Sequence, residues 1–544
     1  MAVLAVLAGW PMVFLARQDI PQTITLISWQ PAAFFPNLPA LLIDDISWYF
    51  SFALISLALS SIVTSIAHLG RSLKNDRSQG KNKIEVIEVQ ELSEKVSSSS
   101  EPTSVEENKP TTHWQSWAGT LVLTSLGLVA VNAGNMLTLL LAWAALDLIE
   151  LVILLVQVLQ SKSRERIILV FSLRMAGIGM VLLAWIIPWS QGISLNFNVI
   201  DQSIIIYLLL AAGLRLVALA LQFPLNDQHV QTHEFETILR LVPAAACYIL
   251  LVRVANIGVL GAVSPLFLGI AALAGLYAGV HWINANNELN GQPYWLIGTA
   301  SLAIASAILN RPSACIAWSL ASLLSGGLIF SMSIRHKNLI PIVFIGFIGF
   351  SALPFSPTWL GTDLYEYTGS PSNTISPPLF YMLSFAFLLS HSLFLAGFIR
   401  NILRDIFPYD KHLEFHVERW VWFLFPAGLI LIIVTHFLIG ILLFPALSEI
   451  QLTGWIIGAV AVAISGIIWL LPTHYFQGFT RRDQAIKTSA INKFLSLDWL
   501  YRFFWKLLHT LIRLAALIST ILEGDGGILW AFVLFALIFV FLLR

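Results

Sequence analysis

Two acids and two arginines lie inside apolar stretches of this chain, where charged side chains are rare. Asp147 and Glu150 interrupt one such stretch, and Arg174 and Arg215 interrupt the next two. The two acids are three residues apart, so they share one face of a helix. A charge at bilayer depth is costly unless it is paired or reaches water. These four residues therefore predict either an ion path or a buried ion-pair cluster that fixes helix packing, and both interpretations stay open.

Other titratable residues inside apolar stretches are candidates for the same path. Glu236 shares a stretch with Arg240, and His281 and His391 lie in later ones. Imidazole titrates near neutral pH and can carry protons, although a single histidine in an apolar helix more commonly bonds to a neighbouring group.

The composition identifies an integral membrane protein. Of 544 residues, 57% are hydrophobic and 11% charged, and the mean hydropathy is +0.80, whereas soluble domains carry about 25% charged residues. The two cysteines, Cys247 and Cys315, lie in apolar stretches far from any CxxC spacing. The chain shows no catalytic motif, metal site or cofactor site, and nothing in it suggests nucleic-acid binding.

Apolar stretches of helical length recur along the chain and predict an all-α polytopic protein with about 14–15 transmembrane helices. Five regions are expected: N-terminal spans (1–70), a polar loop (71–113), a transmembrane core (114–472), a basic loop with an amphipathic helix (473–525) and a final span (526–544). We interpret residues 2–16 as an anchor, with a signal peptide as the alternative. Asp44 and Asp45 stand where the second span begins, a position that suits capping.

The predicted spans of the core and its flanks are 115–132, 134–159, 167–188, 203–223, 235–256, 262–283, 294–310, 312–334, 338–358, 378–401, 420–445 and 454–472. These spans imply which loops lie on the same side of the membrane, an assignment that we call the threading. The loops test it, because cytoplasmic loops are enriched in Lys and Arg. The loops after 159, 334, 401 and 472 are basic, and those at 189–202, 257–261, 359–377 and 446–453 contain no Lys or Arg; Arg17 and Arg311 are exceptions. The threading places the basic loops in the cytoplasm.

Prolines interrupt two of the spans. Pro224 follows the span with Arg215, and Pro354 and Pro357 lie near the end of another. Broken helices at matching places in two halves indicate inverted repeats around a transport path. Ordinary loop prolines are the alternative for each.

Several segments, in the right order, resemble the antiporter-like membrane subunits of respiratory complex I and of multisubunit cation/proton antiporters. NAGNMLTLLLAW resembles the family's GNLLTLFLAWE helix, and LQFPL and SALPFSPTW resemble its AQFPL and SALPPTAGF segments. IDDISWYFSF, SLRMAGIGMVLL and SLDWLYRFFWK match further segments, the last from the largest subunit type. The resemblance spans most of residues 41–543. It implies two inverted five-helix repeats with broken helices and a C-terminal amphipathic lateral helix before the final span.

The departures from the family pattern concern its charged residues. Ala144 replaces the family glutamate, with Asp147 one turn later, and the expected lysine falls near Leu219, with Arg215 one turn earlier. Ala317, Ala321 and Ser325 would occupy the positions of two family histidines and a lysine. Arginine does not usefully deprotonate, so Arg215 is a poor replacement for a relay lysine.

The resemblance implies a diverged proton-translocating subunit of an NADH–quinone oxidoreductase or cation/proton antiporter type complex. Its partners would be other membrane subunits, the lipid bilayer and protons, with Na⁺ as the alternative ion. The host membrane would be a bacterial plasma membrane or a thylakoid. The alternatives are a non-conducting scaffold or coupling subunit, and a membrane subunit of an inorganic-carbon uptake or membrane hydrogenase system.

Overall fold

The computed structural model describes most of the chain up to residue 470. The described residues are 2–26, 38–67, 113–157, 161–190, 197, 202–221, 233–257, 261–285, 288–332, 337–367, 375–403, 419–444, 452–470 and isolated positions between 506 and 539. The chain divides into two compact units, Met1–Pro472 and Thr473–Arg544. The polar loop and Pro224 lie outside the described residues, as does most of the predicted amphipathic helix and of the final span.

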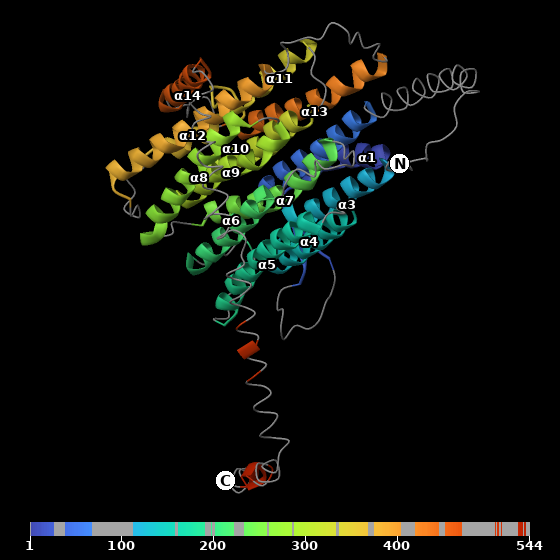
Figure 1. Cartoon of the computed structure of the whole chain (residues 1–544), viewed down its shortest axis with the longest axis vertical. Coiled ribbons are helices and arrows are strands. Elements are labelled where there is room, and N and C mark those ends of the chain that lie inside the picture. Colours follow the sequence, from blue (N-terminus) through green and yellow to red (C-terminus); the bar gives the residue numbers. More distant parts are fainter. Residues whose placement is uncertain are drawn as a thin grey trace, which may run out of the picture. The chain divides into compact units, whose positions relative to one another are not determined.

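The first unit is a bundle of α-helices with one short two-stranded sheet (Figure 1). Its α-helices are α1 (Ala2–Leu15), an unlabelled helix Asp45–Ala67, α3 (His113–Val131), α4 (Met136–Gln157), α5 (Ser161–Ser190), α6 (Ile205–Leu221), α7 (His233–Ala255), α8 (Ser264–Asn284), α9 (Glu288–Ile308), α10 (Pro312–Phe330), α11 (Ile340–Phe350), α12 (Pro377–Leu403), α13 (Arg419–Leu443) and α14 (Leu452–Leu470). Among the described residues, nine helices are long and apolar enough to cross a membrane, and three more apolar helices are shorter.

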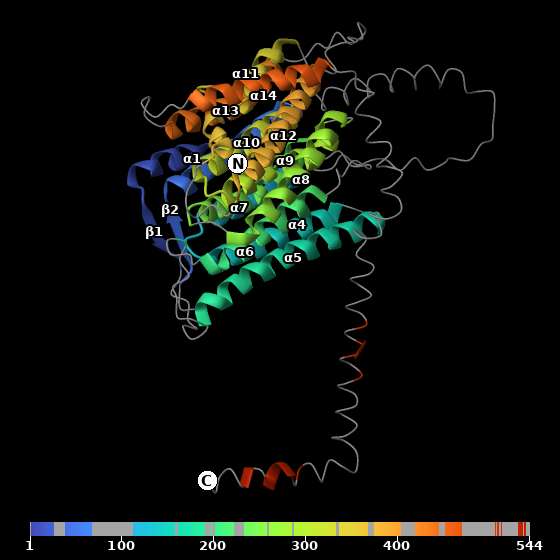
Figure 2. The same cartoon turned by 90° about the vertical axis from the view of Figure 1, so that its left-hand side faces the viewer.

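Helix α7 lies at the centre of the first unit. Its whole apolar stretch is buried, and it packs against α3, α6, α9 and α10. In both views α4–α6 lie on one flank and α11, α13 and α14 on the opposite flank, with α7–α10 between them (Figures 1 and 2). By contrast, only 39% of the apolar stretch of α4 and of α5 is buried, as in helices that face lipid or another subunit.

The structure corrects the predicted boundaries of two spans and adds an element. Helix α9 begins at Glu288 rather than near 294, and α11 ends at Phe350 rather than near 358. A β-hairpin of β1 (Gln22–Thr25) and β2 (Ala40–Ile43) lies beside α1 and was not predicted (Figure 2). Its strands are only four residues long, too short for an alternating pattern to stand out.

α11 ends in a sharp, partly buried turn around Pro354 and Pro357, in which Phe355 is exposed. Ala352 and Phe355 have φ angles of 55° and 64°, which are uncommon for residues other than glycine. The Thr358 hydroxyl accepts a hydrogen bond from the Ala352 amide at 2.9 Å and donates to the Gly349 carbonyl at 2.8 Å. The chain then forms the short 3₁₀ helix η5 (Trp359–Tyr365). This segment therefore interrupts the helix where the sequence predicted a break.

Contacts between helix ends agree with the predicted threading. Arg253, near the end of α7, pairs with Asp44, and Arg311, before α10, donates to the carbonyl of Glu366. The threading puts both contacts on the non-cytoplasmic side. At the other end, Arg400 of α12 donates to the carbonyl of Ile283 in α8, and both helices are expected to end in the cytoplasm.

Candidate functional site

Helix α4 turns its two acids into the bundle. Asp147 and Glu150 are each 1% exposed, whereas Leu148, Val152 and Val156 on the other face are 54–72% exposed. The spacing of three residues puts both carboxylates on one face, and Arg174 contacts both of them. Glu150 is buried, so it does not reach the surface from this position.

Asp147 is held by two arginines from neighbouring helices. Arg215 of α6 donates to both carboxylate oxygens, at 2.6 and 2.8 Å, and Nε of Arg174 in α5 lies 3.0 Å from Oδ1. Such two-pronged, charge-assisted bonds are among the strongest in proteins. The structure thus brings together all four charged residues that the sequence analysis placed first.

The aromatic residue before the acids also contributes. The guanidinium of Arg215 lies 4.2 Å from the ring centre of Trp143, a cation–π contact. Gly177 of α5 makes room for the same side chain, because a Cβ there would come within 2.7 Å of the Arg215 Cγ. Close packing therefore explains this glycine, and the contact with Trp143 could not be read from sequence spacing.

The row of buried charged residues continues onto α7. Glu236 and Arg240 form an ion pair at 2.7 Å, and Arg240 is close enough to Glu150 to interact with its charge. Both side chains are almost completely buried. The line contains three acids and three arginines and is neutral overall; its members are Asp147, Glu150, Glu236, Arg174, Arg215 and Arg240. We call these six residues the charged line.

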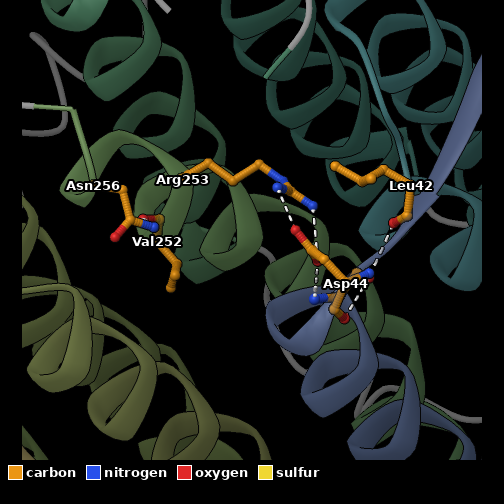
Figure 3. A network of polar contacts seen from close by, with 6 residues as sticks. Leu42, Asp44, Val252, Arg253 and Asn256 are labelled. Carbon is orange, nitrogen blue, oxygen red and sulfur yellow. Dashed lines mark hydrogen bonds and ion pairs between the residues drawn. The ribbon is translucent and has the colours of Figure 1, made fainter. Parts of the chain in front are cut away.

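A separate ion pair lies at the opposite end of α7 (Figure 3). Arg253 donates to both oxygens of Asp44, at 3.0 and 3.2 Å. Asp44 also caps its helix as predicted, since its carboxylate accepts from the Ser47 amide at 2.8 Å. Arg253 was not among the predicted candidates, because it stands at the edge of an apolar stretch like an ordinary flanking residue.

The candidate histidines lie on other helices and do not join the charged line. His391 of α12 donates from Nε2 to the carbonyl of Phe350, the last residue of α11, at 3.0 Å. It thereby satisfies a carbonyl at the helix break. His281 of α8 stacks on Tyr294 at 4.8 Å between ring centres. These contacts match the interpretation that a histidine in an apolar helix bonds to a neighbour.

Helix α10 carries no charge where the family pattern expects one. Ala317, Ala321 and Ser325 are all buried there. Among the described residues, no group of three His, Cys, Asp or Glu side chains could hold a metal ion. Cys247 and Cys315 are buried free thiols. The charged line on α4–α7 is therefore the chemically distinctive part of the described bundle.

Comparisons with known proteins give structural but not sequence matches. No family model and no curated protein matches the chain. A chain of the Mrp complex from Dietzia sp. DQ12-45-1b is similar, with TM-score 0.59, 13% identity and coverage of 95% of this chain and 61% of that one. This chain therefore spans less than two thirds of that relative.

Two respiratory complexes contain further similar chains. A chain of the archaeal membrane-bound sulfane sulfur reductase has TM-score 0.56, 13% identity and coverage of 100% of this chain and 94% of that one. A chain of respiratory complex I from Thermus thermophilus has TM-score 0.51, 15% identity and coverage of 81% and 92%. At such low identity the likeness concerns the fold. The chain is thus a multi-pass membrane protein that shares its fold with chains of these three membrane complexes.

Proposed function

We propose that this chain is a proton-translocating, antiporter-like subunit of a multisubunit membrane complex, and that protons move along the charged line. The observation that supports the proposal best is the continuity of this line across four packed helices, from Asp147 on α4 to Glu236 on α7. Buried ionisable residues that are paired in this way typically mark proton paths.

Within the line, Glu150 is the acid that we expect to exchange a proton. If Asp147 were protonated, Arg215 would lose its carboxylate partner, and leaving a buried charge uncompensated costs about 3–5 kcal/mol. If Glu150 is protonated, Arg174 keeps its contact with Asp147. Asp147 therefore acts as a fixed anion that holds the two arginines.

Glu236 is the expected point of proton entry. It lies in the first turn of α7, at the end that the threading places toward the cytoplasm, and it is 6% exposed. Arg240 stands between Glu236 and Glu150 and interacts with both. Because Arg240 interacts with both carboxylates, a change in the charge of one of them alters the electrostatic environment of the other.

A non-conducting scaffold subunit is the second candidate, and one observation favours it. Arg215 lies one turn before the position at which the antiporter-like subunits have a lysine. It is bonded to both oxygens of Asp147 and stays charged. A cluster locked in this way can fix helix packing without moving protons. In either role we expect other membrane subunits as partners, because the similar chains come from multisubunit complexes.

Proton flux into liposomes separates these two functions. The complex is reconstituted with wild-type chain, with Glu150→Gln or with Asp45→Asn, a control at an exposed acid that begins a helix. Conduction predicts that Glu150→Gln abolishes flux and that Asp45→Asn leaves it at the wild-type level. Equal flux in Glu150→Gln and wild type, or no flux in the wild-type complex, would rule conduction out.

A further inference from the structure

Trp143 of α4 lies where α4, α6 and α7 meet, and its side chain is 0% exposed. Its indole N–H donates to the carbonyl of Ala246 in α7 at 3.3 Å. The guanidinium carbon of Arg215 in α6 lies over its ring, 4.2 Å from the ring centre. Asp147 follows one turn later on α4, so the ring and the carboxylate lie on the same side of the helix. Arg215 therefore contacts α4 at two places, one aromatic and one charged.

These two contacts constrain the guanidinium group of Arg215 in different ways. The bonds to the two oxygens of Asp147, at 2.6 and 2.8 Å, fix one edge of the planar group. They leave the group free to tilt about that edge. The ring of Trp143 lies against the guanidinium, so it limits this tilt and keeps water away from the charge on that side.

The rest of the Arg215 side chain is enclosed by smaller residues. Gly177 of α5 lies against its stem, since a Cβ at Gly177 would come within 2.7 Å of the Arg215 Cγ. Cys247 of α7 is close enough to interact with Arg215. Trp143 is larger than either of these neighbours, so its truncation opens the most space beside the guanidinium.

We propose that Trp143 is a positioning residue that holds Arg215 on Asp147. A guanidinium bonded to both oxygens favours the ionised carboxylate, so Trp143 thereby keeps Asp147 as the fixed anion of the charged line. Glu150 then remains the acid that exchanges a proton. This last consequence rests on the proposed function, whereas the effect of Trp143 on the pair of Asp147 and Arg215 can be measured without proton flux.

The test measures the coupling between Asp147 and Arg215 with and without the aromatic ring. The full chain with Asp147→Asn, with Arg215→Met and with both is unfolded in mixed micelles of mild detergent and dodecyl sulfate. The coupling is the factor by which the unfolding constant of the double variant departs from the product of the two single effects. The same cycle is repeated in the presence of Trp143→Leu and of Trp143→Phe. A residue that only fills space changes all members of the cycle by about the same factor and leaves the coupling unchanged.

Trp143→Leu should lower the coupling about tenfold, because it removes a desolvated contact between a ring and a guanidinium. Trp143→Phe loses the N–H bond to Ala246 but keeps an aromatic face, and it should retain most of the coupling. If Trp143→Leu does not fold, Trp143→Met takes its place, since it fills more of the space without a ring. A coupling within about twofold of the wild-type value in the folded variant without a ring would overturn the proposal.

Trp318→Leu is the matched control. Trp318 of α10 is also 0% exposed and also donates its N–H to the carbonyl of another element, that of Gly361 at 3.1 Å. Its ring packs against Phe350 and His391 instead of an arginine. Trp318→Leu should therefore lower stability and leave the coupling unchanged; an equal loss of coupling in this control would also overturn the proposal. Absence of flux in the wild-type complex would instead count against the proposed function and would leave the coupling result intact.

Discussion

Replacing Asp147 with asparagine should destabilise the bundle more than any other single change in the charged line. Asp147 accepts two bonds from Arg215, at 2.6 and 2.8 Å, and lies 3.0 Å from Arg174. Asparagine has almost the same shape but no charge. Arg215 would then lose its carboxylate partner, and Arg174 would keep only Glu150.

The expected loss follows from the burial of the pair. Removing one partner of a buried ion pair costs about 3–5 kcal/mol, and both Asp147 and Arg215 have fully buried side chains. Glu150→Gln should cost less, about 1–3 kcal/mol, since Arg174 keeps Asp147. The double variant Asp147→Asn/Arg215→Met removes the excess charge and should recover stability relative to Asp147→Asn alone.

Unfolding in mixed micelles of mild detergent and dodecyl sulfate, followed by tryptophan fluorescence, measures these differences. Asp45→Asn at an exposed helix start is the control and should behave as wild type. A loss below about 1 kcal/mol for Asp147→Asn would refute the reasoning. So would a double variant that is less stable than Asp147→Asn alone, because the arginine charge would then not be the source of the loss.

Three further outcomes can be checked by the same unfolding assay. Burial raises the pKa of Asp363, in η5 outside the membrane-spanning helices, to about 6. Its contribution to stability should be greatest below pH 3.8, its ordinary pKa, and fall as pH rises through 6; Asp363→Asn should flatten this dependence. Arg253→Met should lower the free energy of unfolding by about 1 kcal/mol, because it breaks a partly exposed pair with Asp44, and Arg253→Lys should lose less. Gly298→Ala should cost about 1–3 kcal/mol, because its Cβ would overlap a buried phenylalanine ring of α12, whereas Gly269→Ala, with open space around it, should be neutral or stabilising.

The order and approximate extent of the membrane helices could be predicted from the sequence because they depend on local properties. Hydrophobic length, helical period and the Lys and Arg of the loops are all read within a few tens of residues. The same local reasoning identified Asp147, Glu150, Arg174 and Arg215 as residues that need partners. It predicted an interruption near Pro354 and Pro357 but placed the end of that span near 358, whereas α11 ends at Phe350 and a turn follows.

The choice of partners was decided only by the tertiary structure. Arg215 and Asp147 are 68 residues apart in the chain, and Arg253 and Asp44 are 209 apart, so their pairing depends on which helix faces meet. The sequence spacing shows that a carboxylate and a guanidinium are available, but not that Arg215 occupies both oxygens of Asp147. Because of that contact, we expect Glu150 rather than Asp147 to exchange a proton. The hydroxyls of Tyr248, Thr299 and Ser322 likewise meet only because α7, α9 and α10 pack together at Ser322, and a serine in an apolar helix gives no sign of its partners.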